Sequence, residues 1–340
     1  MLHRTRLSSL ILVLILSMAL LAGCDRTTPE PTAIPISFTE TPTQQPAETL
    51  PAVPTNLVTV GLETWDPGQQ GEIRGTLQNI AASAGLTMVE KSAADIATAS
   101  SDAKVVVVFV ETPNILDLAT AAPESRFIYV TSTQQSTAVN LAIIQLPETQ
   151  QAFLAGYLST IISPDFRSAG LFRADDQVGY NQVYAFQNGG SYYCGTCYPY
   201  YAPLVQFPLV GYQPAGVDTT AWQTTANELI KNVVYTMYFD EFASDPVLLS
   251  DLASKGVILT GKRTPPDTIR SMWAATISFD LVTPLQNLSG FMNSTQETSE
   301  IIAPLAVRDI NENLFSTGKQ ANVANIQKAL EAGLISPDNP

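Results

Sequence analysis

The sequence of 340 residues predicts an α/β fold of two lobes, each built on a doubly wound, mainly parallel sheet. From Leu57 onward, short β-branched or apolar runs alternate with amphipathic helical segments. The alternation restarts after residues 148–172, where a helical segment leads into a new apolar run. Two successive α/β units of this kind predict two lobes joined by crossover connections.

The first unit begins with a strand and a helix whose ends are marked by the sequence. Asp66 is expected to be the N-cap, Pro67 the first helical residue, and Gly85 the stop after Ala84. The run Val105–Val110 is apolar throughout, as expected for a central parallel strand that is covered on both faces. The expected strands are Leu57–Leu62, Leu86–Glu90, Val105–Val110, Phe127–Thr131 and Leu141–Gln145, and a second helix is expected over Pro113–Ala121.

The segment Glu148–Phe172 predicts a helix, a turn and a buried strand. Large apolar residues recur at helical spacing over Glu148–Ile162, and small residues between them leave a strip where a helix can lie close to a sheet. Ser163-Pro164 is expected to end this helix, because the residue before a proline is pushed out of the α region. This segment therefore opens the second unit.

The second unit repeats the alternation. Its expected strands are Arg167–Phe172, Leu204–Leu209, Val233–Phe239, Val257–Leu259 and Trp273–Phe279, and its expected helices are Tyr180–Gln187, Thr219–Lys231, Pro246–Ser254 and Thr283–Met292. Glu300–Val307 is predicted to be a strand that returns across the lobes, and Ala321–Ala332 a closing helix. We therefore expect an N-terminal lobe over residues 56–147, a C-terminal lobe over 148–299, and a return strand with a closing helix over 300–340.

The amino terminus has the pattern of a lipoprotein signal. Arg4 and Arg6 precede an apolar run that is short for a membrane span, and Leu-Ala-Gly-Cys ends at Cys24. The motif resembles a bacterial lipobox, which implies cleavage after Gly23 and acylation of Cys24. The alternative is an ordinary signal peptide with a coincidental cysteine. Several acyl chains on one residue anchor a protein stably.

Residues 24–55 are expected to form a tether rather than a domain. They are rich in Thr, Pro, Glu and Gln and contain few large apolar side chains, so they cannot bury a core. The expected location is extracytoplasmic, on the outer face of the cell membrane. Asp25 resembles an inner-membrane retention signal, which applies if the organism has two membranes.

Composition excludes several functional classes. The chain has 17 Lys+Arg against 31 Asp+Glu, a net charge of −14, and this acidic balance without basic clusters argues against nucleic acid as a partner. The only histidine is His3, inside the predicted signal segment, so the mature chain has no imidazole base, nucleophile partner or metal ligand. No phosphate-binding glycine loop of standard spacing is present. Chemistry that uses carboxylates alone stays open, but no glycosidase-like signature is present, so we expect neither an enzyme nor a cofactor.

Cys194 and Cys197 lie in NGGSYYCGTCYPYYAP, which is expected to be an irregular aromatic loop over Asn188–Pro203. Outside the cytoplasm, a structural disulfide is the first interpretation. A redox pair, which would favour a helix N-terminus, is the second, and a loop that faces a ligand is a third. A zinc site would need two more ligands, and no further cysteine or histidine is available in the mature chain.

Ala152–Leu158, AFLAGYL, followed by a strand that ends in Gly-Leu-Phe, resembles the segment that opens the second lobe in the basic membrane lipoprotein family. The tail over Asn311–Gly318 and Gly333–Ile335 is similar in style to the family's C-terminal end. The resemblance implies a type I periplasmic-binding-protein-like fold and, most commonly, a nucleoside ligand. The chain differs from the family after the first strand, at residues 63–66 (ETWD), and late in the second unit, at Val257–Arg263 (VILTGKR).

Ligands of open α/β sheets bind beyond the carboxyl ends of the strands. A tryptophan there can stack on a flat ring, and carboxylates can accept hydroxyl or ammonium hydrogens. Lys262 and Arg263 follow a predicted strand of the second unit. The other candidate ligand-binding residues at such positions are Glu63, Thr64, Trp65, Glu111, Thr112, Ser132, Asp175, Asp176, Asp240 and Glu241.

The function expected from the sequence is that of a membrane-anchored solute-binding lipoprotein. It would capture a nucleoside-like, sugar or cationic solute between its lobes for an ABC-type permease or a sensor. Two alternatives stay open. One is a surface interaction module on the same fold that binds no small ligand, and the other is a thiol oxidoreductase that uses Cys194 and Cys197.

Overall fold

A computed structural model describes residues 55–293 and 298–338, and all of them belong to one compact unit. The predicted signal segment, Cys24 and the tether over residues 24–55, apart from Thr55, lie outside the described residues. Within the described ranges, every helix is too short or too polar to cross a membrane.

The first sheet has the order β11-β5-β4-β3-β1-β2, and every neighbouring pair is parallel. Successive side chains of β3 are buried in the hydrophobic cores on opposite faces of the sheet. Val105 and Val107 belong to one core, and Val106 and Val108 belong to the other. Burial on both faces explains why this run is apolar throughout. The strands are β1 (Asn56–Val60), β2 (Thr87–Lys91), β3 (Ala103–Val108), β4 (Arg126–Thr131), β5 (Leu141–Gln145) and β11 (Glu300–Ile302).

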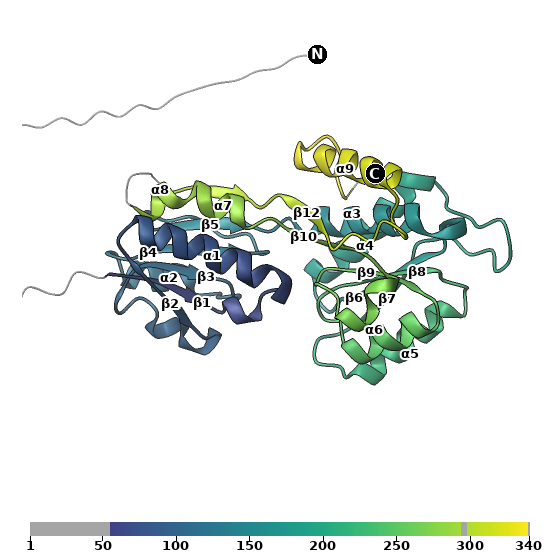
Figure 1. The fold of residues 1–340 in the computed structure, drawn as a ribbon, viewed down its shortest axis with the longest axis horizontal. Coiled ribbons are helices and arrows are strands. Elements are labelled where there is room, and N and C mark those ends of the chain that lie inside the picture. The colour runs from purple at the N-terminus through teal and green to yellow at the C-terminus, as the bar shows by residue number, and fades with distance from the viewer. Residues whose placement is uncertain (1–54, 294–297, 339–340) are drawn as a thin grey trace, which may run out of the picture. The chain divides into compact units, whose positions relative to one another are not determined.

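Helices α1 (Pro67–Ser83), α2 (Ile115–Ala121), α7 (Val282–Asn287) and α8 (Ser289–Met292) lie with the first sheet (Figure 1). Short 3-10 turns occur at Leu62–Thr64 and Ala93–Thr98. Helix α7 packs on α1, so the chain after β10 returns to the first sheet. This differs from the expected division, which assigned all of residues 148–299 to the second lobe.

The second sheet has the order β12-β10-β9-β8-β6-β7, parallel except for β12, which is antiparallel to β10. Its strands are β6 (Ser168–Arg173), β7 (Leu209–Gln213), β8 (Thr236–Phe239), β9 (Ile258–Gly261), β10 (Trp273–Phe279) and β12 (Leu305–Arg308). Its helices are α3 (Glu148–Ile162), α4 (Gln177–Cys194), α5 (Thr219–Ile230), α6 (Pro246–Ser254) and α9 (Thr317–Glu331), with 3-10 turns at Pro164–Phe166 and Asp267–Met272. The predicted fold class, two α/β lobes with mainly parallel sheets, is confirmed.

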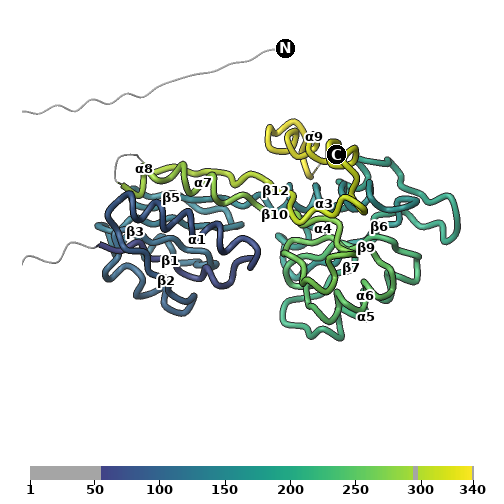
Figure 2. Tube along the Cα trace, viewed as in Figure 1, coloured from purple at the N-terminus to yellow at the C-terminus, as the bar shows by residue number. Residues whose placement is uncertain are grey.

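Three connections join the lobes, and Figure 2 lets the reader follow them along the trace. The chain passes from β5 to α3, from β10 to α7, and from β11 to β12. The expected single strand over Glu300–Val307 is therefore two strands in two different sheets. Pro304 lies between β11 and β12. It has no N–H group to donate to a strand ladder, so a single continuous strand is interrupted at this residue. Its carbonyl accepts a hydrogen bond from Asp280 N at 2.8 Å, which ties two of the connections together.

The region between α4 and β7 differs most from the sequence prediction. Leu204–Leu209 is not a strand, because β7 begins only at Leu209, after Pro208, which has no N–H to donate to a ladder. Helix α4 continues past Gln187 to Cys194, so the first half of the expected loop over Asn188–Pro203 is helical. Gly189 and Gly190 lie inside this helix and are buried.

Close contact between α3 and α4 explains why those glycines are tolerated. Every residue of α3 from Gln151 to Ile162 is buried, although the pattern had indicated only one apolar face. Gly156 of α3 lies against the backbone of Phe186, and Gly189 of α4 lies against the backbone of Phe153, so a Cβ at either position would collide with main-chain atoms. Because glycine has no side chain, Gly156 and Gly189 allow the backbones of α3 and α4 to approach this closely.

We expect Gly156→Ala to lower the free energy of unfolding by about 1–3 kcal/mol, because the new methyl group forces two backbones apart. The matched control is Gly71→Ala in α1, where a Cβ meets no atom within 4 Å. That change should raise the free energy of unfolding by about 0.5–1 kcal/mol through helix propensity. Urea unfolding followed by circular dichroism measures both, and equal effects would contradict the close-contact explanation.

Candidate functional site

The described residues enclose a cleft of about 560 Å³ to which both lobes contribute. Most of its lining follows the carboxyl end of a strand: β1, β3 and β4 in the first lobe, and β6, β8 and β9 in the second. The lining residues are Thr64, Trp65, Asp66, Gln69, Phe109, Val110, Glu111, Val130, Ser132, Thr133, Leu146, Glu148, Gln151, Arg173, Asp176, Val178, Gly179, Gln182, Asp240, Glu241, Phe242, Lys262, Arg263, Ser278 and Phe279.

Most of the candidate residues from the sequence meet in this cleft. Those that line it are Thr64, Trp65, Glu111, Ser132, Asp176, Asp240 and Glu241, together with Lys262 and Arg263. Three candidates lie outside the lining. Glu63 accepts a hydrogen bond from Ala93 N at 3.0 Å, Asp175 accepts one from Ala215 N at 2.8 Å, and Thr112 is buried with its hydroxyl donating to Val110 O at 2.9 Å.

Several lining residues were missed by sequence reasoning. Phe242 follows Asp240 by two positions, so the strand-end rule would have found it had the rule been extended by one residue. Phe109 and Phe279 are apolar residues at strand ends and looked like ordinary core. Gln69 and Gln151 lie inside helices, where no sequence signal marks them.

One wall of the cleft is apolar and comes mainly from the first lobe. It consists of Trp65, Phe109, Val130, Leu146 and Phe279. The ring of half-buried Trp65 lies 6.2 Å from that of Phe109 at an interplanar angle of 59°. Its indole Nε1–H donates to Gln69 Oε1 at 2.8 Å, which fixes the ring orientation. This wall suits the flat face of a ring.

The other wall carries charge from the second lobe. Lys262 Nζ lies 2.8 Å from Glu148 Oε1 and 3.5 Å from Glu241 Oε2. Gln182 Nε2 donates to the second oxygen of Glu148 at 2.6 Å. Burial lowers the pKa of Lys262, but the two neighbouring carboxylates outweigh that effect and leave its pKa raised. Lys262 is therefore a fixed cation with two acidic partners.

Asp240 organises the loop after β8. One carboxylate oxygen accepts from Phe242 N and Ala243 N, both at 2.9 Å, and the other accepts from Arg173 N. Burial nevertheless raises the pKa of Asp240 to about 6, against a partial opposing effect of those N–H groups. Both oxygens are thus engaged by the protein itself.

Glu111 sits at the centre of a hydroxyl network in the first lobe. It accepts from Tyr129 Oη at 2.9 Å and from Thr131 Oγ1 at 3.1 Å, with the hydroxyls of Ser132 and Thr133 at 3.4 Å. Burial raises the pKa of Tyr129, so its hydroxyl stays protonated and donates. Across the cleft, the guanidinium of Arg173 lies 4.3 Å from the ring centroid of Phe242.

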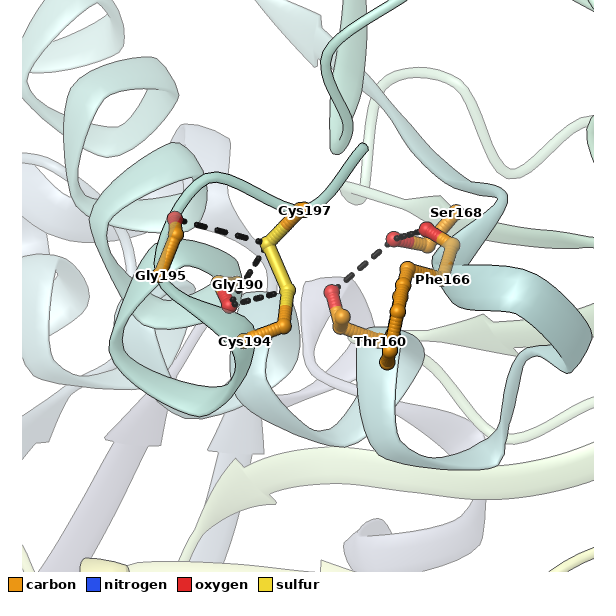
Figure 3. The surroundings of a disulfide bond; sticks show 7 residues. All are labelled: Thr160, Phe166, Ser168, Gly190, Cys194, Gly195 and Cys197. Atoms are coloured by element: carbon orange, nitrogen blue, oxygen red, sulfur yellow. Dashed lines mark hydrogen bonds between the residues drawn. A yellow bond between two sulfur atoms is a disulfide. The ribbon is translucent and has the colours of Figure 1, made fainter. Parts of the chain in front are cut away.

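Cys194 and Cys197 form a disulfide in the structure. Figure 3 shows both sulfur atoms beside the carbonyl of Gly190, with Cys194 as the last residue of α4 and Cys197 on the segment that follows it. The pair therefore lies at a helix C-terminus, whereas a lowered thiol pKa would require an N-terminus. Neither cysteine lines the cleft, and Cys197 is buried. These positions favour the structural interpretation over the redox one.

The described residues contain no group of three or more His, Cys, Asp or Glu side chains placed to bind a metal ion. The cleft is lined by apolar and by polar side chains from both lobes. Such a concave site, with one apolar wall and a few oriented polar groups, is typical of small-molecule binding.

No protein-family model matches this chain, and no curated protein sequence matches it either. Solved structures do. A solute-binding protein of an ABC transporter system from Conexibacter woesei aligns with a TM-score of 0.63 at 13% identity, over 83% of this chain and 98% of that one. A transcriptional activator of the comK gene from Bacillus halodurans aligns with a TM-score of 0.63 at 11% identity, over 82% and 98%.

A solute-binding protein of an ABC transporter from Agrobacterium vitis, bound to α-D-tagatopyranose, aligns with a TM-score of 0.55 at 11% identity, over 78% and 98%. At such low identity these similarities show the fold, which is that of type I periplasmic-binding-protein-like solute-binding proteins. They do not confirm the resemblance to the basic membrane lipoprotein family.

The partly buried ion pair gives a test of the charged wall. We expect Lys262→Met to lower the free energy of unfolding by about 1.5–3 kcal/mol, because Glu148, whose side chain is 13% exposed, loses its charged hydrogen-bond donor. Lys255→Met is the matched control, since the ion pair of Lys255 with Asp251 is 2.6 Å long but about 40% exposed. This substitution should lower the free energy of unfolding by about 1 kcal/mol or less. Urea unfolding at neutral pH compares them, and similar losses would refute a stronger contribution from the less exposed pair.

Asp240 makes stability depend on pH. Because its pKa is about 6 in the folded protein, above the unfolded value of about 3.9, the native state takes up a proton first. Protonation of Asp240 therefore stabilises the folded protein. This stabilisation is fully present below the pKa of the unfolded aspartate and is lost as the pH rises through about 6. We expect the free energy of unfolding of the native protein, relative to that of Asp240→Asn, to increase between pH 7 and pH 5. Parallel urea titrations measure this, and identical pH dependence in both proteins would exclude the assignment.

Proposed function

We propose that this protein is an extracytoplasmic solute-binding protein that closes its two lobes on a small organic ligand and performs no chemistry on it. The observation that carries the proposal is the cleft, which both lobes line from the carboxyl ends of their strands. The solved structures with this fold include ABC-transporter solute-binding proteins, among them proteins with bound D-allose and α-D-tagatopyranose.

The two unlike walls favour an uncharged ring-shaped ligand with hydroxyl groups, such as a nucleoside-like solute or a sugar. The apolar wall at Trp65 offers a surface for a ring face, and the polar wall offers donors and acceptors for hydroxyls. A cationic solute is less favoured, because Glu148 is already paired with Lys262 and both oxygens of Asp240 accept backbone N–H groups.

The sequence of the amino terminus supports anchoring to the membrane. Acylation at Cys24, after Leu-Ala-Gly, would attach the protein to the outer face of the cell membrane, which is the inner membrane in a cell with two. The tether over residues 24–55 would then separate the binding lobes from the bilayer. In that position the protein would deliver its ligand to an ABC-type permease or to a sensor.

We expect calorimetric titration with a panel of nucleosides, monosaccharides, amino acids and polyamines to show binding of one uncharged ring ligand. Trp65→Ala should weaken that binding at least roughly tenfold, because the ring loses its apolar partner. Tyr200→Ala is the control, since its side chain is 80% exposed and lies outside the cleft. Absence of binding across the whole panel would favour an interaction module that binds no small ligand.

A further inference from the structure

Helix α1 makes contacts from the first lobe to three separate elements of the second. Asp66, Gln69 and Glu72 lie three residues apart, so they occupy one face of the helix start. Asp66 accepts hydrogen bonds from Thr264, through its backbone N at 2.9 Å and its hydroxyl at 2.8 Å. Thr264 follows β9 in the second lobe.

The other two residues extend this contact. Gln69 Nε2 donates to Ser278 Oγ on β10 at 2.7 Å, and Glu72 forms an ion pair of 2.8 Å with Arg308 on β12. Gln69 is buried, and its side-chain oxygen also accepts the indole N–H of Trp65. The side-chain amide of Gln69 therefore links Ser278 of the second lobe to the Trp65 ring, which lines the cleft.

Asp66 has an unusual role for its position. It is the N-cap residue of α1, where an aspartate normally accepts from the backbone N–H two or three residues later. Here the side chain makes no such bond and turns to Thr264 instead. If the lobes separate, the same carboxylate can accept the N–H groups at its own helix start, which gives it a partner in either state.

We propose that Asp66, Gln69 and Glu72 form a clasp that holds the two lobes together without needing a ligand, and that Asp66 exchanges Thr264 for its own helix amides when the cleft opens. The contacts are made by atoms of the chain itself, so no ligand has to bridge them. Arg263 adds a further contact of the same kind, because its Nη2 donates to Thr64 O at 2.8 Å. The three clasp residues are positioning residues, since they act through the lobe geometry and the Trp65 ring.

The clasp has a consequence for affinity that rests on the proposed function. A ligand that binds the closed state binds with an apparent affinity that scales with the population of that state. Weakening the clasp should therefore raise the apparent dissociation constant even though Thr264 lies outside the cleft lining.

The test measures the distance between the lobes in ligand-free protein. Spin labels are placed at two exposed positions, Glu124→Cys in the first lobe and Ser254→Cys in the second, with Cys24 replaced by Ser in every protein compared. Thr264→Val removes the hydroxyl donor. Thr219→Val is the matched control, because it removes a Thr–Asp hydrogen bond of 3.0 Å, to Asp245, that lies within the second lobe.

We expect the native protein and Thr219→Val to show one main interlobe distance, and Thr264→Val to gain a longer one, with the open-to-closed ratio raised roughly tenfold. Asp66→Asn keeps a side chain able to cap a helix but offers one acceptor oxygen in place of two, so it should also gain the longer distance. Unchanged distances in both variants, or an equal gain in the control, would overturn the clasp. This result does not depend on finding a ligand, so a silent ligand panel leaves it intact.

Discussion

The direction of the parallel strands is the constraint on which the rest of the structure depends. The five neighbouring pairs in the first sheet and four of the five in the second are parallel, so all strands except β12 end at a common edge of their sheet. Both edges contribute to the same cleft. Residues as distant in the chain as Trp65 and Lys262 are brought to one site by this topology alone.

The two lobes supply different chemistry to that site, and packing explains the difference. In the first lobe Phe109, Val130 and Leu146 continue the apolar interior to the cleft surface, and Glu111 beside them is held by neighbouring hydroxyl groups. In the second lobe the strand ends carry Arg173, Asp240 and Lys262, which would be costly to bury alone. They are tolerated because each is paired with an opposite charge or with backbone N–H groups.

Much of the fold could be predicted from sequence because its signals are local. The bounds of β5, α3, α6 and β10 agree with the predicted ranges to the residue. The failures arise where long-range packing decides. Helix α4 extends to Cys194 because its glycines fit against α3, and a glycine-rich, tyrosine-rich sequence does not reveal that contact. The return strand divides at Pro304 because its halves belong to different sheets.

Most of the candidate site residues lie together in the cleft, but their hydrogen bonds could not be predicted from the sequence. The strand-end rule selected loops that line the cleft, because the rule follows from sheet topology, which the sequence pattern predicts. It assigned ligand-accepting roles to carboxylates that the structure uses otherwise. Glu63 accepts from Ala93 N, Asp175 accepts from Ala215 N, and Asp240 accepts from three backbone amides.

These assignments share one physical cause. A chain that leaves a strand has N–H groups with no partner in the ladder, and a nearby carboxylate is a strong acceptor for them. Acidic residues after parallel strands are therefore recruited by their own loops before any ligand arrives. An aromatic ring has no such competing demand from the backbone. For this reason Trp65 is the more informative residue about a ligand than the acidic side chains that outnumber it.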